Sequence, residues 1–318
     1  MRHIRQWLVT GVVLGGIVSV PTPRCARAQG GGGPSTRTSL LVTAAWLAQH
    51  LHDPDLVLLH VGDAAEYRVA HIEGARLVGL GDISVSDHSG KGLMLEMPSP
   101  DSLRKDLAAL GISDKSRIIV YSGKDWVTPA TRVMFTLDYA GLGGRSSLLD
   151  GGMWAWTRAG NSVSEAVPAP TSGSLSPLHT RPIVVNAEYV KAHIGKSGTS
   201  IVDGRAAVFY DGVQHGGGMG VEQRAGHIPS AKSVPFTEIT DAQLLLKSAA
   251  ELQALFTRAG VAPSDTVVGY CHIGQQATGM LFAARSLGHP VLLYDGSFED
   301  WSRHTEFPVE NPAEKKKP

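Results

Sequence analysis

Residues 266–277 read TVVGYCHIGQQA and contain the change of pattern that decides the fold. Val267, Val268 and Tyr270 form a short apolar run typical of a buried strand, and an apolar helical pattern begins at Ala277. Cys271 therefore ends a strand and faces the amino end of a helix, where free backbone N–H groups and the helix dipole favour an anion. Because both effects favour thiolate over thiol, Cys271 is a candidate nucleophile.

The same alternation of strands and helices continues on both sides of this stretch. Asn186 is typical of a helix N-cap and Gly260 of a helix C-terminus. The alternation predicts an α/β fold in which helices cover both faces of a mainly parallel sheet. In this half we expect helices at 186–194, 251–259, 277–287 and 296–303, and strands at 200–203, 267–270 and 291–294.

The first half of the chain repeats the second. In the repeat Ser122 stands where Cys271 stands, which predicts that the first half is not catalytic. The segment 161–182 is rich in Gly, Ser, Thr and Pro and is typical of a linker. We therefore expect two tandem domains, at 38–160 and 183–310. The matching segments are DGGMWAW (150–156) with DGSFEDW (295–301), HIEGA (71–75) with HIPSA (227–231), and IIVYS (118–122) with VVGYC (267–271).

The first 28 residues have the pattern of a secretory signal peptide. Arg2 and Arg5 precede an apolar stretch at 7–20, and Ala26-Arg-Ala28 is a small-residue cleavage pattern. An uncleaved anchor is the alternative, although the apolar stretch is short for a membrane span. Cleavage near Ala28 predicts an exported protein, periplasmic or extracellular, without stable membrane insertion. It would also remove Cys25, one of the two cysteines, so that no disulfide could form within the mature chain.

Composition and motif spacing disfavour several other functions. The 29 basic and 29 acidic residues balance, so the sequence carries no electrostatic signature of nucleic-acid binding. The 13 histidines form no metal-binding motif. Ala277 stands where a cysteine phosphatase would need its phosphate-binding arginine, and the lone thiol excludes Cys-x-x-Cys chemistry. We expect neither a metal nor another cofactor.

The ordered set of motifs resembles the tandem-domain rhodaneses of the sulfurtransferase superfamily. The set comprises IVDGR (201–205), GHIPSA (226–231), the loop after Tyr270, and DGSFEDW (295–301), with LHVGD (59–63) among the counterparts in the first half. The resemblance covers nearly all of the mature chain in family order.

The resemblance implies a sulfurtransferase that carries a sulfane sulfur as a Cys271 persulfide. The donor would be a small sulfur compound such as thiosulfate, and the acceptor cyanide or a thiol. Asp203 and Arg205 would brace the loop from below. A carrier or binding module that acts with a partner protein is the alternative. The loop that shapes the pocket would be His272, Ile273, Gly274, Gln275 and Gln276.

Three features depart from the family pattern. His272 and Ile273 follow the cysteine where thiosulfate-preferring members carry basic residues, and the Gly-Ser-Gly-like run of mercaptopyruvate-preferring members is absent. Phe209 stands where some members carry a second arginine. Protonation of His272 would supply part of the missing charge. The glycine-rich insertion 211–226 is either disordered or functional.

Several residues that recur in both halves are expected to belong to the scaffold. His71 and His227 recur in a half without a nucleophile, which argues against a catalytic role. Asp150 and Asp295 are expected to be turn and helix-start residues. Gln275 and Gln276 are expected to contribute backbone N–H groups rather than side chains.

Overall fold

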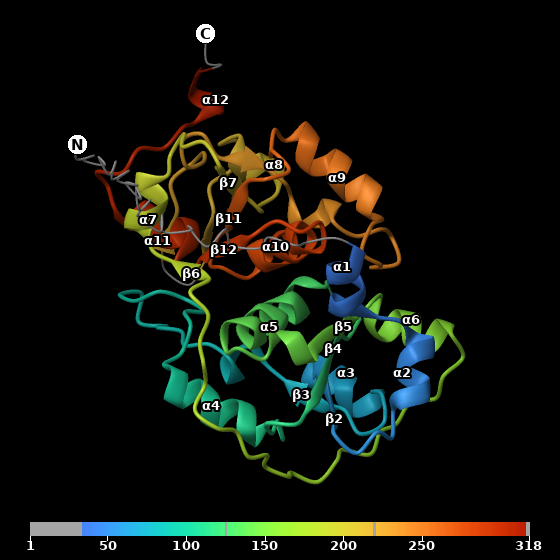
Figure 1. The fold of residues 1–318 in the computed structure, drawn as a ribbon. Helices are drawn as coiled ribbons and strands as arrows, with labels where there is room; N and C mark the ends of the chain where they lie inside the picture. The colour runs from blue at the N-terminus through green and yellow to red at the C-terminus, as the bar shows by residue number, and fades with distance from the viewer. Residues whose placement is uncertain (1–33, 125, 219–220, 316–318) are drawn as a thin grey trace, which may run out of the picture.

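The computed structural model describes residues 34–124, 126–218 and 221–315 (Figure 1). The predicted signal peptide at 1–28 lies outside these residues. Within the described chain, no helix is long and apolar enough to cross a lipid bilayer.

The first domain is built on a five-stranded parallel sheet with strand β4 at its centre. The strand order is β1-β5-β4-β2-β3. The strands are β1 (Leu41–Val42), β2 (Leu56–Val61), β3 (Arg76–Val78), β4 (Arg117–Ser122) and β5 (Ser146–Leu149). The helices are α1 (Pro34–Leu40), α2 (Ala44–His50), α3 (Ala64–Val69), α4 (Pro100–Ala109), α5 (Thr128–Tyr139) and α6 (Gly152–Arg158).

The second domain repeats this plan with strand β11 at the centre. Its parallel sheet has the order β10-β7-β11-β12-β6, and β8 and β9 form a separate hairpin. The strands are β6 (Val184–Val185), β7 (Thr199–Asp203), β8 (Gly217–Gly218), β9 (Val221–Glu222), β10 (Lys232–Ser233), β11 (Thr266–Tyr270) and β12 (Val291–Tyr294). The helices are α7 (Ala187–Ala192), α8 (Ala207–Tyr210), α9 (Ala249–Arg258), α10 (Gln276–Ser286), α11 (Ser297–Arg303) and α12 (Pro312–Lys315).

The prediction of two tandem α/β domains with mainly parallel sheets is confirmed. Local signals place the elements: the Asn186 side chain caps α7 by accepting from Tyr189 N–H at 3.0 Å. Gly260 follows α9 with φ +82°, a conformation that favours glycine. The predicted elements of the second half differ from the observed ones by no more than two residues at either end.

The two domains share one apolar core at their boundary. Helices α5 and α10 pack against each other there (Figure 1), and Met134 and Leu281 belong to the same buried cluster. The Thr131 and Thr278 hydroxyls hydrogen-bond across the boundary at 3.1 Å. Smaller clusters cover the other face of each sheet. Each sheet is therefore buried on both sides, as its continuous apolar strands require.

The segment 161–182 contains no helix or strand and runs along the surface of the first domain (Figure 1). The N–H of Gly173 donates to the Ala108 carbonyl at 2.7 Å, and the N–H of Asp114 donates to the Ser174 carbonyl at 3.1 Å. Leu175 is buried. The segment connects the two domains and is also fastened to the first of them.

Candidate functional site

Cys271 lies directly after the central strand of the second sheet, and its side chain is fully buried. Helix α10 begins five residues later. The Cys271 N–H donates to Ser297 Oγ at 3.2 Å, and the Cys271 carbonyl accepts from Phe298 N–H at 3.0 Å. The thiol is therefore held between the carboxyl end of a strand and the amino end of an 11-residue helix, where backbone N–H groups favour an anion.

The loop after Cys271 turns at Gly274, whose φ is +81°. A Cβ atom at this position would lie 2.7 Å from the Asp295 carbonyl oxygen. Gln275 occupies the N-cap position of α10, and Gln276 is its first residue. The Gln275 side chain also donates to Thr128 Oγ1 in the first domain at 3.3 Å, so it ties the loop to that domain.

Ser297 fixes the other side of the cysteine. It is a non-glycine residue with φ +53°, a conformation that costs L-residues on the order of 1–2 kcal/mol. Its hydroxyl donates to the Tyr294 carbonyl at 2.9 Å and accepts from Cys271 N–H. The strain is thus compensated by two bonds that set the position of the cysteine backbone.

Asp203 and Arg205 form a buried ion pair at the end of β7, the strand next to β11. Arg205 Nη2 donates to Asp203 Oδ2 at 2.6 Å and to the Gly226 carbonyl at 2.7 Å, and its guanidinium lies 4.1 Å from the centre of the Phe298 ring. Burial alone would lower the pKa of Arg205, but attraction to Asp203, and more weakly to Cys271, raises it overall. Arg205 therefore stays charged close to the thiol.

Arg132 of the first domain, a residue that the sequence did not single out, also holds the loop. Its side chain is fully buried and donates to the Gly274 carbonyl at 3.1 Å and to Asp295 Oδ1 at 2.7 Å. It also donates to the Leu95 carbonyl. Its sequence signal is a charged residue early in a largely uncharged helix, whose other charged residue is Asp138. The first domain thus supplies a support for the loop of the second.

Asp150 and Asp295 connect the domains reciprocally. Asp295 Oδ2 accepts from Met97 N–H of the first domain at 2.7 Å, and Asp150 Oδ1 accepts from Leu246 N–H of the second at 2.8 Å. The expectation that both are merely turn and helix-start residues was therefore incomplete. His71, by contrast, bonds the backbone of its own domain at Tyr67, as a scaffold residue would.

A cleft of about 500 Å³ lies against His272 and Ile273. The insertion 211–226, of which 219–220 lie outside the described residues, forms the hairpin β8–β9 and contributes Gln223 to the cleft wall. Phe209 packs edge-on against the His272 ring, with 4.6 Å between ring centres. Cys271 itself is buried beside this wall.

His272 would supply part of the missing positive charge only if protonated, and its surroundings disfavour protonation. Burial, and then repulsion by Arg205, lowers the pKa of His272 to about 4. The imidazole is therefore neutral at pH 7. The reason is tertiary, because the ring packs between Phe209 and Gln223.

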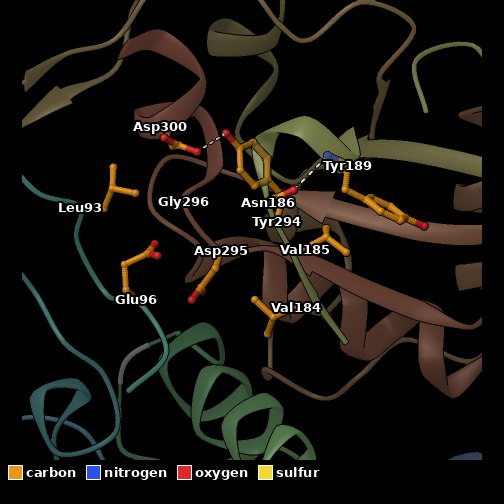
Figure 2. A pocket seen from close by; sticks show the side chains of 10 residues that line it. All are labelled: Leu93, Glu96, Val184, Val185, Asn186, Tyr189, Tyr294, Asp295, Gly296 and Asp300. Atoms are coloured by element: carbon orange, nitrogen blue, oxygen red, sulfur yellow. Dashed lines mark hydrogen bonds between the residues drawn. The ribbon is translucent and has the colours of Figure 1, made fainter. Parts of the chain in front are cut away.

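A second cleft, of about 410 Å³, lies between the first domain and the β12–α11 region of the second. Figure 2 shows the carboxyl groups of Glu96, Asp295 and Asp300 arranged around it, with Tyr294 donating to Asp300 at 2.8 Å. Burial, and then repulsion by Asp295, raises the pKa of Glu96 to about 7. The described residues contain no group of three or more His, Cys, Asp or Glu side chains suited to a metal ion.

The strand registers correct the alignment of the two halves by one residue. Tyr270 pairs with Asp203, and its counterpart Tyr121 pairs with His60. His60 thus occupies the position of Asp203, whereas the motif match placed Val61 there. Ser122 keeps the predicted position at the end of the central strand.

Comparisons with known proteins place the chain in a family. The family model described as "Rhodanese-like domain" matches residues 43–159 and 186–304. The chain is 28% identical to a thiosulfate sulfurtransferase of Pseudomonas aeruginosa, over 85% of this chain and 97% of that protein. It is also 28% identical to a 3-mercaptopyruvate sulfurtransferase of Escherichia coli K12, over 86% and 98%, and 29% identical to the sulfur carrier protein TtuD of Thermus thermophilus, over 85% and 96%.

A solved structure supports the same fold. The anaerobic ergothioneine biosynthesis enzyme of Chlorobium limicola superposes with a TM-score of 0.75 at 22% identity, over 86% of this chain and 71% of that one. The two matched segments together cover most of this chain. The protein belongs to the rhodanese-like family and carries two rhodanese-like domains in tandem.

Proposed function

We propose that the protein is a sulfurtransferase in which Cys271 accepts a sulfane sulfur and passes it to a thiophilic acceptor. The observation that carries the proposal is the buried Cys271 between a strand end and a helix start, in a chain whose full-length relatives include sulfurtransferases. With thiosulfate as the donor, the Cys271 thiolate attacks the outer sulfur. The sulfur–sulfur bond of the donor breaks, sulfite leaves with the electron pair, and a Cys271 persulfide anion remains.

The surroundings of Cys271 suit a persulfide anion. The turn at Gly274 and the amino end of α10 bring backbone N–H groups to this side of the loop. The buried Arg205 guanidinium adds a nearby positive charge, and its Nη1 has no hydrogen-bond partner among the described residues. Asp203 and Arg132 then act on the loop indirectly, as positioning residues.

Intact-mass measurement tests the proposal directly. Incubation with thiosulfate, or with another sulfane-sulfur donor, should add one sulfur atom to the protein, and cyanide should remove it with formation of thiocyanate. Two-substrate kinetics should then follow a ping-pong pattern. The Cys271→Ser variant should show neither signal, and sulfur transfer by that variant at the wild-type rate would disprove the mechanism.

A sulfur carrier that acts with a partner protein is the second candidate. It is favoured by the 29% identity to the sulfur carrier protein TtuD. A carrier would acquire the persulfide increment but turn over small acceptors slowly, so the steady-state rate with cyanide and thiols separates the two candidates.

We also propose that the protein is exported after cleavage near Ala28, on the pattern of residues 1–28. The mass of the mature protein, purified from cell fractions of the native host, tests this. A cytoplasmic protein that retains Met1 would contradict it.

A further inference from the structure

Gln223, in the insertion 211–226, bonds His272 at two points. Its Nε2 donates to the His272 carbonyl oxygen at 3.1 Å, and its Oε1 lies 2.8 Å from His272 Nδ1. Only the amide nitrogen can bond a carbonyl oxygen, so Oε1 must be the atom that faces the ring. Because an amide oxygen only accepts, Nδ1 of His272 carries the proton.

The other ring nitrogen of His272 is consequently an acceptor. Within the described chain, no group hydrogen-bonds Nε2. The ring stays neutral at pH 7 because burial holds its pKa at about 4. Gly216 lies so close that a Cβ atom there would approach Nδ1 to 2.5 Å, and Phe209 packs on the ring. The imidazole is therefore fixed in place as well as in its tautomer.

The fixed cation near the thiol, Arg205, is fully buried in its pair with Asp203 and does not line the cleft, and the lining residue His215 lies 3.3 Å from Glu222. Among the described residues that line the cleft there is no lysine or arginine. The Glu299 carboxylate is already bonded, by Arg303 at 3.0 Å and by Met94 N–H at 3.3 Å. Met94 and Phe209 present apolar surface to the cleft. The cleft thus combines apolar walls with a neutral acceptor.

We propose that this cleft receives small thiols without a negative charge as sulfur acceptors, and that Gln223 is the positioning residue that keeps His272 Nε2 available to accept from them. The inference rests on the proposed function and names the acceptor class of the same site. An S–H or ammonium N–H group can donate a hydrogen bond to Nε2. A carboxylate or sulfonate would instead lose its hydration water and be repelled by the lone pair of Nε2.

The transfer step balances without a further reactant. A thiol R–SH in the cleft turns its S–H from Nε2 to the Cys271 persulfide anion and passes its proton to the outer sulfur, and its own sulfur then attacks that outer sulfur. The bond from Cys271 Sγ to the outer sulfur breaks, and Sγ leaves as a thiolate with the electron pair. The product is the hydropersulfide R–S–SH.

Three thiols with the same two-carbon spacer between the sulfur and the polar group, and with different charge, test the proposal: 2-mercaptoethanol, cysteamine and 3-mercaptopropionate. The protein is first converted to the persulfide, and loss of the mass increment is followed in single turnovers. After correction for the different pKa values of the three thiols, the wild type should react about tenfold more slowly with 3-mercaptopropionate than with the other two.

Substitutions in the cleft separate the role of Gln223 from a general charge effect. In Gln223→Glu, the new carboxylate favours a protonated ring, so Nε2 becomes a donor and 3-mercaptopropionate should gain about fivefold relative to cysteamine. Gln214→Glu places the same charge on the cleft wall at a residue that does not bond His272, and it should further disfavour the anionic thiol. Equal shifts in both variants would overturn the positioning role.

The ¹⁵N chemical shifts of the His272 ring give a readout independent of activity. Nδ1 should be protonated and Nε2 unprotonated from pH 5.5 to pH 8 in the wild type, and a proton on Nε2 would overturn the inference. If the persulfide forms but the rates of all three thiols follow from their pKa values alone, the inference is wrong and the proposed function stands. If no donor forms a persulfide, the proposed function fails and this inference fails with it.

Discussion

The ends of the two central strands, β4 and β11, differ although the sheets around them are alike. In the second domain Cys271 donates its N–H to Ser297, which has φ +53°. In the first domain Ser122 stands at the strand end, and Gly152, with φ +52°, stands in place of Ser297. The backbone shape is therefore common to both domains, and only the second pairs it with a thiol and a strained serine.

The side chains beneath the two strand ends also differ, because only the second domain has charged groups there. The second domain has the buried Asp203–Arg205 pair, whereas the first has neutral His60, which bonds the Tyr121 hydroxyl at 2.9 Å, and Gly62. Because a rhodanese-like sheet forms in both cases, the fold does not require the ion pair. Burying an ion pair costs desolvation free energy, and because the fold does not need the pair, we attribute it to support of the loop around Cys271.

Exchanging the residues at the two strand ends should have the largest effect. Cys271→Ser should abolish persulfide formation and lower sulfur transfer by more than about 1,000-fold, because an alcohol cannot carry the sulfur. Ser122→Cys should not create a second sulfur-transfer site. The first domain has no counterpart of the Asp203–Arg205 ion pair, and Gly152 stands in place of Ser297. Persulfide content per chain, by mass, checks both. A Cys271→Ser, Ser122→Cys double variant that acquires a persulfide at the wild-type rate would contradict the comparison.

The next largest effect should come from removing Arg132, through which the first domain supports the loop after Cys271. Arg132→Ala leaves Asp295 without its buried partner and should lower the free energy of unfolding by about 3–5 kcal/mol. Arg132→Lys keeps the charge but loses the two-pronged geometry, so stability should recover more than the rate of persulfide formation.

Arg104→Ala is the matched control for Arg132. Arg104 belongs to the same domain and donates to the Leu175 carbonyl at 3.3 Å, away from the loop. The Arg104→Ala variant should leave the rate of persulfide formation unchanged. Denaturant unfolding and single-turnover rates separate stability from positioning, and parallel losses in Arg104→Ala and Arg132→Ala would contradict a specific role for Arg132.

His60 should make the first domain sensitive to acid. Burial, and then repulsion by His71, lowers its pKa from 6.5 to about 4. The unfolded chain therefore binds more protons than the folded one between these values, and stability present above pH 6.5 is lost as the pH falls toward 4. His60→Asn can still accept from Tyr121, and it should reduce the loss of stability between pH 7 and pH 5 by about 1–2 kcal/mol. Urea unfolding at the two pH values checks this, and identical losses in wild type and variant would contradict it.

Local patterns were sufficient to predict most of the fold. The apolar runs and the end signals at Asn186 and Gly260 placed the elements of the second half, because these signals act within a few residues. The position of Cys271 followed from the same patterns. The one-residue error at His60 arose because the two motifs match in letters while strand register is set by pairing.

The remainder of the site depended on contacts between segments that are distant in the chain. Arg132 and Gly274 are 142 residues apart, and nothing near Arg132 indicates a partner in the other domain. The neutral state of His272 depends on burial by Phe209 and Gln223, which a sequence pattern does not show. Residues that fix loops and titration states therefore needed the structure.

Exchanging Ser297 and Gly152 should have the smallest effect on persulfide formation. It tests how much of the difference between the two strand ends is due to backbone strain. Ser297→Gly relieves the left-handed strain, by about 1 kcal/mol, but removes the acceptor of Cys271 N–H, worth a similar amount. Stability should therefore change by less than about 1 kcal/mol while persulfide formation slows several-fold. Gly152→Ser should destabilise the first domain, because a Cβ atom there would lie 2.3 Å from Ser122 Oγ and 2.6 Å from its carbonyl oxygen. Thermal unfolding and single-turnover rates measure both, and a Ser297→Gly variant with unchanged rates would show that the Cys271 loop does not depend on this serine.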